Sequence, residues 1–192
     1  MRLAKVKRKT KETKIEIKLN LDGDGNSKVN TGLKFFDHML SSMIKYSRFD
    51  ITVVAKGDID VDDHHTIEDV GICIGKALDK ALGRRKGISR FGHSFVVMDD
   101  SLSFVSLDMG GRGYHVLDLV FSSEKIGDIT SQNIPHFLES FAREGRFNIF
   151  AKTIHGTNDH HKAESLFKAL GISLNNSCKV VGKEVPSTKG VI

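Results

Sequence analysis

The chain has 192 residues, of which 39% are hydrophobic and 28% are charged, and this balance is typical of a globular domain rather than a disordered segment. No run approaches the ~18 consecutive apolar residues of a membrane-spanning helix, so we expect no membrane-embedded segment. The formal net charge of +5 favours an anionic partner, but it does not choose between a phosphorylated metabolite and a nucleic acid.

The N-terminal segment and the cysteines indicate the compartment, and the chain length limits the number of domains. The segment 1–9 carries cations without an apolar stretch behind them, so we expect no secretory signal. Cys73 and Cys178 are too few and too far apart for a disulfide framework or a thiolate metal site. We therefore expect a cytoplasmic protein. The length fits one domain of ordinary size, or two half-domains fused around one core.

The first half of the chain alternates strand patterns with helix patterns. Strict apolar–polar alternation predicts half-buried strands, and apolar residues spaced by three and four predict amphipathic helices. The glycines and aspartates of 22–26 predict a hairpin turn rather than a calcium loop, because the glycine comes too early. The expected elements are a short edge strand or frayed terminus at 5–9, a strand at 13–20, a helix at 35–44, a strand at 49–55 and a helix from His64 that ends at Gly83.

After the link 84–87 the same order returns, so each half is predicted to run strands, helix, strand, helix. The half-repeats are expected at 1–86 and 87–192, together forming one catalytic domain. The tail 183–190 has no periodicity and either orders on a ligand or a neighbouring subunit, or is disordered. The expected elements are strands at 95–98, 102–109 and 114–121, a helix that starts near Pro135, a strand at 147–154 and a long helix from His160.

A duplicated histidine motif is the most informative feature of the sequence. Asp63-His64-His65-Thr66-Ile67-Glu68 recurs half a chain later as Asp159-His160-His161-Lys162-Ala163-Glu164. His38 and His136 lie at matched places in the two preceding helices. Residues three or four apart share a helix face, so each glutamate can act beside a histidine of its own motif. A single copy would most often be a surface feature, whereas the duplicate indicates a metal site.

Neighbouring histidines on a helix are poorly placed to hold one ion, because adjacent residues point about 100° apart. We expect one histidine per ion, with two ions that each draw on both copies of the motif. Imidazole and carboxylate without thiolate suit manganese, iron, cobalt or zinc, and six-coordinate chemistry with open positions favours Mn²⁺, with zinc as the competitor. The predicted ligands are His38, His64, His65, Glu68, His136, His160, His161 and Glu164.

Scattered cations indicate a phosphate site. Arg112 lies in a glycine-rich turn, and Lys168 lies one helical turn beyond Glu164. Arginine can hold two phosphate oxygens at once, and flanking glycines allow the backbone to approach closely. Arg90 and Lys189 are the further candidates, and no Walker loop or GxGxxG fingerprint accompanies them.

Four long segments resemble the imidazoleglycerol-phosphate dehydratases of histidine biosynthesis, and the match runs nearly end to end. The segments are 35–40 (FFDHML), 62–69 (DDHHTIED), 158–168 (NDHHKAESLFK) and 186–190 (PSTKG). The resemblance implies a duplicated α/β (α+β) fold of the ribosomal-protein-S5-domain-2-like kind, with sheet and helix layers. It implies two Mn²⁺ ions per active site, a small phosphorylated imidazole substrate, and a 24-subunit assembly built from trimers with sites between subunits.

The resemblance also implies roles for individual residues. The eight metal ligands are the same as those predicted from spacing, and Glu12 matches the family's active-site glutamate, which spacing alone does not identify. Ser42 and Tyr46 depart from the family, because many members have Gln and His at these positions. The implied catalytic residues are Glu12, Glu68, Glu164, His65 and His161. The implied substrate-binding residues are Glu12, His38, Tyr46, His64, Glu68, Arg90, Arg112, His160, Lys168, Ser187, Thr188 and Lys189.

The implied reaction converts imidazole glycerol phosphate into imidazole acetol phosphate, and it must remove a carbon-bound proton of low acidity. We expect a metal ion to lower this barrier as a Lewis acid, with Glu12, or a water that it orients, transferring the proton.

Three alternatives remain: a dinuclear metal-dependent phosphatase or hydrolase, an RNA-binding module, and a metal-dependent structural assembly without activity. Two separate motif copies argue against a carboxylate-bridged metal pair. Phenylalanines at core spacing, without a basic-aromatic stripe, argue against RNA binding. We therefore expect neither nucleic acid nor membrane as a partner.

Overall fold

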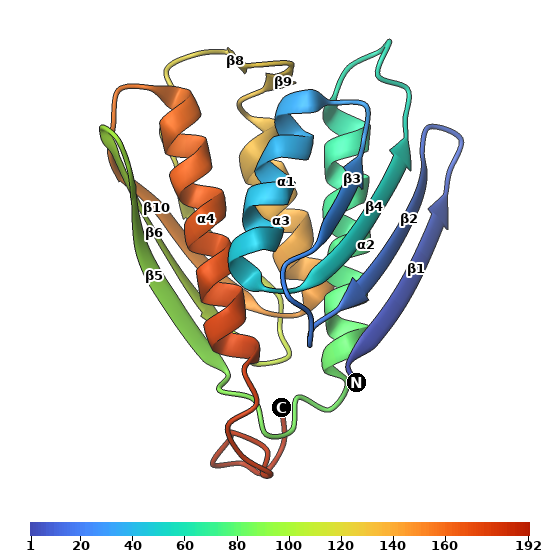
Figure 1. Cartoon of the computed structure of the whole chain (residues 1–192), viewed down its shortest axis with the longest axis vertical. Coiled ribbons are helices and arrows are strands. Elements are labelled where there is room, and N and C mark those ends of the chain that lie inside the picture. The colour runs from blue at the N-terminus through green and yellow to red at the C-terminus, as the bar shows by residue number, and fades with distance from the viewer.

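Two four-stranded sheets lie on either side of four helices (Figure 1) in the structure, a computed structural model that describes residues 1–192. The first half contains β1 (Leu3–Lys9), β2 (Lys14–Asn20), β3 (Ser27–Asn30), α1 (Lys34–Ser47), β4 (Asp50–Lys56) and α2 (His64–Leu82). The second half contains β5 (Phe91–Met98), β6 (Ser101–Asp108), β7 (Tyr114–Asp118), β8 (Lys125–Ile126), β9 (Ile129–Thr130), α3 (Asn133–Gly145), β10 (Asn148–His155) and α4 (Asp159–Cys178).

The two halves repeat one topology. The strand orders are β1-β2-β4-β3 and β5-β6-β10-β7, and in each sheet the last strand pairs in parallel while the other pairs are antiparallel. The small β8–β9 ribbon belongs to the second half alone. The repeated order of strands and helices predicted from the sequence is therefore present in the structure.

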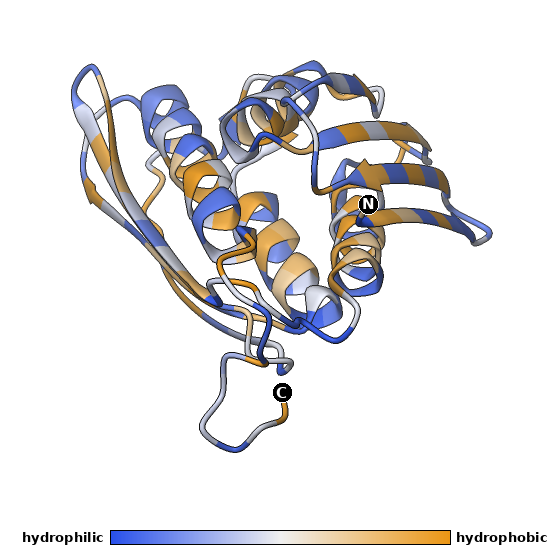
Figure 2. Ribbon diagram, turned by 60° about the horizontal axis from the view of Figure 1, so that its bottom comes forward, coloured by the Kyte–Doolittle hydropathy of each residue, from blue (hydrophilic) through white to orange (hydrophobic).

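Alternating side chains turn one face of each sheet toward the helices. In β2, Ile15, Ile17 and Leu19 are buried while their neighbours are not, and bands of apolar and polar colour alternate along β1, β2 and β4 (Figure 2). A single hydrophobic cluster of 44 buried residues draws on both halves, so they share one core. None of the four helices combines the length and the apolar character needed to cross a membrane.

The predicted hairpin at 22–26 is wrong. After this turn the chain forms β3, which runs parallel to β4, while β2 pairs with β1 and β4. The carboxylate of Asp50 holds the turn, because one of its oxygens accepts hydrogen bonds from Asp24 N and Asn26 N at 3.1 and 2.9 Å. Local turn residues predict that the chain reverses, but they do not determine which strand the next segment joins.

The link between the halves is held by a buried arginine. Arg85 is only 3% exposed, and its guanidinium donates to the carbonyl oxygens of Gly145, Arg146 and Met109. It also forms an ion pair with Asp79. The link therefore ties the end of α3 to the end of α2, since Arg85 satisfies carbonyls that α3 leaves unpaired.

The helices pair across the halves, because α2 packs on α3 and α4 packs on α1 (Figure 1). Gly75 in α2 and Gly171 in α4 occupy the same position relative to the duplicated motif. A Cβ atom on Gly75 would lie 2.7 Å from the carbonyl oxygen of Phe141, and one on Gly171 would overlap the carbonyl oxygen of Met43. Each glycine therefore lets two helix backbones approach closely.

We expect Gly75→Ala and Gly171→Ala each to lower the free energy of unfolding by about 1–3 kcal/mol, because the added methyl group meets backbone that cannot move aside easily. The loss should occur although alanine favours helix over glycine by about 1 kcal/mol. Thermal unfolding measures the effect. Gly182→Ala is the control, since nothing lies within 4 Å of its added Cβ atom. Unchanged stability in both helix variants would contradict the packing argument.

Candidate active site

Three potential metal ligands from both halves meet near the start of α4. The Nε2 atoms of His38, on α1, and His160, on α4, lie 3.7 and 3.3 Å from Oε2 of Glu164. All three donor atoms lie within 4.8 Å of one another. An ion about 2.1 Å from each ligand requires ligand atoms roughly 3–4 Å apart. The residues of this set therefore fit a single cation.

An equivalent set lies at the start of α2 and includes His136 of α3. The Nε2 atom of His64 lies 3.7 Å from Oε2 of Glu68, and the rings of His64 and His136 have centroids 4.7 Å apart. This set is looser, because only the set on α4 brings three donor atoms within 4.8 Å, and Arg143 lies 3.9 Å from Glu68. Within one chain, each set thus combines one motif with the upstream histidine of the other half.

The second histidine of each motif faces away from the set built by the first. Nδ1 of His65 lies 3.1 Å from Oδ2 of Asp58, and Nδ1 of His161 lies 2.7 Å from Oδ1 of Asp100. Neighbouring helical residues point about 100° apart, so the second histidine reaches other partners than the first. This divergence places two of the eight predicted ligands outside both sets of the single chain.

Glu12 lies in the turn between β1 and β2, beside the second histidine of the first motif. Its Oε2 atom is 3.9 Å from Nδ1 of His65. The second half repeats this arrangement in the β5–β6 turn, where Oδ2 of Asp99 lies 3.4 Å from Nε2 of His161. A carboxylate between the first two strands of each half therefore lies beside the second histidine of that half.

Aspartates fix the helix starts that carry the histidines. Asp63 accepts hydrogen bonds from the backbone N–H and the hydroxyl of Thr130 at 2.7 and 2.8 Å. Asp128 reaches the start of α1 and accepts from the N–H groups of Lys34 and Phe35, at 2.5 and 2.9 Å. The first residue of each motif is therefore structural. Its partner in the second motif, Asp159, behaves alike and accepts from the N–H groups of Ser122 and Ser123.

Two carboxylates of the site keep their negative charge at neutral pH. Burial raises the pKa of Glu164, but the hydrogen bond and the positive charge of Lys168, together with the nearby rings of His38 and His160, outweigh it and leave the pKa below its ordinary value. The backbone N–H of Thr157 and the ring of His161 hold the pKa of Asp100 far below its usual range. An anionic Glu164 is what a cation site requires, because a ligand must be deprotonated to bind.

Lys168, one of the phosphate candidates, lies beside the set formed by His38, His160 and Glu164 and apart from the other phosphate candidates. Its Nζ atom lies 2.9 Å from Oε1 of Glu164 and 5.8 Å from the ring centroid of Tyr46. The structure thus brings Tyr46, one of the two departures from the family pattern, to the edge of this set.

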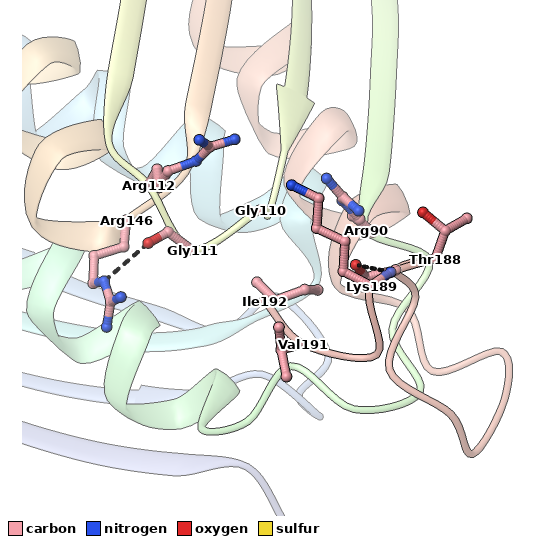
Figure 3. A pocket seen from close by; sticks show the side chains of 10 residues that line it. Arg90, Gly110, Gly111, Arg112, Arg146, Thr188, Lys189, Val191 and Ile192 are labelled. Atoms are coloured by element: carbon pink, nitrogen blue, oxygen red, sulfur yellow. Dashed lines mark hydrogen bonds between the residues drawn. The ribbon is translucent and has the colours of Figure 1, made fainter.

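The remaining phosphate candidates surround a cavity of about 370 Å³ (Figure 3). Arg90 is held in place there, because its Nε and Nη2 atoms donate to Asp108 at 2.7 and 3.1 Å and its Nη1 atom donates to Pro186 O at 2.9 Å. Arg146 also lines the cavity, and its Nε atom donates to Gly111 O at 3.1 Å. The predicted residues that line the cavity are Arg90, Arg112, Ser187, Thr188 and Lys189.

The metal sets and the cavity lie at opposite ends of the helices. The sets are at the N-terminal ends of α2 and α4, whereas the cavity is lined in part by residues 187–189, 191 and 192 of the tail. Figure 1 shows this tail beyond the C-terminal end of α4. A helix of 20 residues is about 30 Å long. A small substrate therefore cannot contact a metal set and the cavity of the same chain.

Comparison with known proteins decides the family. The family model described as imidazoleglycerol-phosphate dehydratase matches residues 31–174. The chain belongs to the imidazoleglycerol-phosphate dehydratase family. The enzyme of this name from Methanothermobacter thermautotrophicus is 50% identical over 190 residues, which cover 99% of this chain and 97% of the relative. The enzyme from Methanosarcina mazei is 48% identical over 192 residues, the whole of both chains.

Solved structures of the family share the fold. The dehydratase of Pyrococcus furiosus superposes with a TM-score of 0.85 at 33% identity, covering 97% of this chain and all of the other. That of Staphylococcus aureus gives 0.85 at 29% identity, covering 93% and 99%. The chain is thus a hydro-lyase that dehydrates imidazole glycerol phosphate to imidazole acetol phosphate in histidine biosynthesis, and it has the predicted duplicated half-domain α+β fold.

Some residues that line the cavity or contact the histidines were not singled out from the sequence. Arg146 follows the end of α3 in a left-handed conformation, with φ of 52°, and no motif indicates it. Asp58, Asp99 and Asp100 lie in turns, and only their pairing with the second histidines shows a connection to the site. One signal was available for Asp99 and Asp100. They lie between the first two strands of the second half, at the place that Glu12 occupies in the first half.

We expect Asp108→Asn to loosen the C-terminal tail of this dehydratase, because Asp108 orients the arginine that donates to Pro186 O. Loss of a partly buried ion pair worth about 0.5–1 kcal/mol raises the population of the open tail roughly two- to fivefold, and the rate of cleavage rises with it. Limited trypsin digestion at Lys183 and Lys189 measures this rate. The control is Asp118→Asn, which removes an ion pair with Lys152 that is not in contact with the tail. Equal rates in the two variants would show that Arg90 does not hold the tail.

Proposed function

We propose that the chain carries out this dehydration in the cytoplasm with two Mn²⁺ ions per active site, in sites completed by neighbouring subunits of a 24-subunit assembly. The separation of the metal sets from the phosphate cavity along the helices is the observation that supports shared sites. Because one substrate cannot contact both within a chain, a second chain must supply one of them.

The donor chemistry supports two ions of one kind. His38, His160 and Glu164 would hold one ion. His64, Glu68 and His136 would hold the other, and each set then has room for a further ligand and for substrate. A bound Mn²⁺ ion supplies a Lewis acid that stabilises negative charge developing on the substrate's imidazole ring.

The second histidines are suited to complete the sets of a neighbouring subunit. His65 and His161 lie on helix starts, and their side chains are 36% and 25% exposed. Each pairs through Nδ1 with an aspartate, Asp58 or Asp100, that belongs to neither set of its own chain. Supplying one histidine to each ion from another chain would give four protein ligands per ion and would link metal binding to assembly.

The residues of the cavity would bind the substrate's phosphate group. Asp108 and Pro186 O fix the guanidinium of Arg90 in advance, so that less side-chain freedom is lost on binding. Arg112 and Lys189 add positive charge, and Ser187 and Thr188 add hydroxyl donors. These contacts would orient the substrate while its imidazole ring reaches a metal set on another chain.

An apolar sheet surface supports self-association. On the outer face of the second sheet, Phe91, Phe95 and Tyr114 are 59%, 62% and 67% exposed. The outer face of the first sheet is instead rich in lysine, with Lys7, Lys14 and Lys18 among the residues that line a broad groove. Soluble monomers rarely expose large apolar patches, so we assign the aromatic face to contact with a further copy of the chain.

We expect chelator treatment to abolish dehydration and to reduce particle size together, and Mn²⁺ to restore both, because the same histidines serve the ions and the contacts between subunits. Formation of the ketone product and light scattering on the same samples measure the two effects. Magnesium, which prefers oxygen ligands, is the control and should restore neither. Full activity in metal-free protein would contradict the metal role, and an unchanged particle size would contradict the link to assembly.

We expect Glu12→Gln to lower turnover by about 10²–10⁴-fold, the usual contribution of a group that transfers a proton. Metal content and particle size should not change, because Glu12 belongs to neither metal set. Steady-state ketone formation, metal analysis and light scattering provide the measurements. Glu16→Gln on the lysine-rich sheet face is the matched control and should keep its activity. Normal turnover in Glu12→Gln would exclude it from proton transfer.

A further inference from the structure

Nδ1 of each second histidine lies beside a carboxylate. Nδ1 of His161 lies 2.7 Å from Oδ1 of Asp100, and Nδ1 of His65 lies 3.1 and 3.3 Å from the two oxygens of Asp58. A neutral imidazole carries its proton on one nitrogen and a lone pair on the other. An ionised carboxylate only accepts hydrogen bonds, so the nitrogen that faces it must be the one that carries the proton.

The carboxylate of Asp100 is fixed by its surroundings. While Oδ1 faces the ring of His161, Oδ2 accepts three hydrogen bonds: from Thr157 N at 2.6 Å, from Thr157 Oγ1 at 2.9 Å and from Asn158 N at 3.0 Å. These donors belong to the turn between β10 and α4, and Asn158 in turn caps α4 by accepting from His160 N. The two oxygens of Asp100 therefore have different and fixed partners.

The carboxylate of Asp58 is not fixed in this way. Both of its oxygens lie near Nδ1 of His65, and its side chain accepts no other hydrogen bond. It can turn about its terminal bond and still present an oxygen to the ring. In both halves an aspartate lies beside Nδ1 of the second histidine. The orientation of the carboxylate is fixed in Asp100 but not in Asp58.

We propose that Asp58 and Asp100 are positioning residues that keep the proton of His65 and His161 on Nδ1, so that Nε2 offers its lone pair to the metal ion. The inference rests on the proposed function, because it assigns these histidines as metal ligands. His64 shows the same arrangement within one chain: Asn133 Oδ1 lies 3.0 Å from its Nδ1, while its Nε2 atom faces Glu68. Nε2 of His161 also has a carboxylate neighbour, the 70%-exposed Asp99, but at 3.4 Å, whereas Asp100 lies 2.7 Å from Nδ1. The shorter contact with the fixed carboxylate therefore keeps the proton on Nδ1.

Asparagine substitutions distinguish the control of the proton position from the effect of the negative charge beside the histidine. In Asp100→Asn only one oxygen remains, and the three donors of the turn hold it where Oδ2 was. The amide NH₂ group then faces Nδ1 of His161, which must accept and shift its proton to Nε2, where it blocks the ion. In Asp58→Asn the amide can turn its oxygen toward Nδ1 of His65 and preserve the tautomer. Each variant removes one negative charge beside one second histidine.

The test titrates Mn²⁺ into chelator-treated, full-length protein and measures ions bound per chain and their affinities by calorimetry. We expect Asp100→Asn to lower the affinity of the sites that use His161 by about 10–100-fold, as is usual when the outer partner of a metal-binding histidine is lost. Asp58→Asn should bind Mn²⁺ nearly as the unsubstituted chain does. The melting temperature of metal-free Asp100→Asn should stay close to that of the unsubstituted chain, whereas Asp100→Ala should melt lower because three donors lose their acceptor.

Each other outcome overturns the inference. Unchanged affinity in Asp100→Asn shows that Asp100 does not set the tautomer. Equal losses in Asp58→Asn and Asp100→Asn show that charge, rather than proton position, is responsible. A metal-free melting temperature in Asp100→Asn as low as that in Asp100→Ala shows a merely structural role. If the unsubstituted chain itself binds no Mn²⁺, the proposed function fails instead, so the two failures are distinguishable.

Discussion

The close pairing of helices across the two halves is the interaction on which the rest of the structure depends. Gly75 and Gly171 allow α2 to approach α3 and α4 to approach α1. This pairing brings a histidine of one half beside a histidine and a glutamate of the other. A half-domain alone would carry His64 and Glu68 without His136, so the duplication builds complete ligand sets only when both halves share one core.

The helix starts must also be held at one end of the molecule, and the segment around β8 and β9 does this. Asp128 binds the start of α1, while Asp63 and Asp159 reach residues of this segment from α2 and α4. Asp63 and Asp159 are buried, and the hydrogen bonds that they accept outweigh this burial and hold the pKa of each carboxyl below its ordinary value. The aspartate before each histidine pair is thus a structural anchor for the ligands that follow it.

The length of the helices then divides the chemistry between the two ends of the chain. The proposed metal ligands lie at the N-terminal ends, and the proposed phosphate cavity lies near the C-terminal end of α4, about 30 Å away. The second histidines, His65 and His161, pair with Asp58 and Asp100 instead of joining the ligand sets of their own chain, and one sheet exposes phenylalanines. These features share one explanation, which is that the proposed active site needs more than one copy of the chain.

The sequence by itself determined the family, the repeated order of strands and helices, and the histidines and glutamates that the fold then gathers into sets. These follow from local patterns: alternation for β2, three-and-four spacing for α1, and a motif that occurs twice. The tertiary structure alone decided that β3 joins β4 instead of pairing with β2, that His38 meets Glu164, and that Arg85 is buried. The physical reason is that periodicity specifies which face of an element is apolar, whereas its partner depends on packing between segments far apart in the chain.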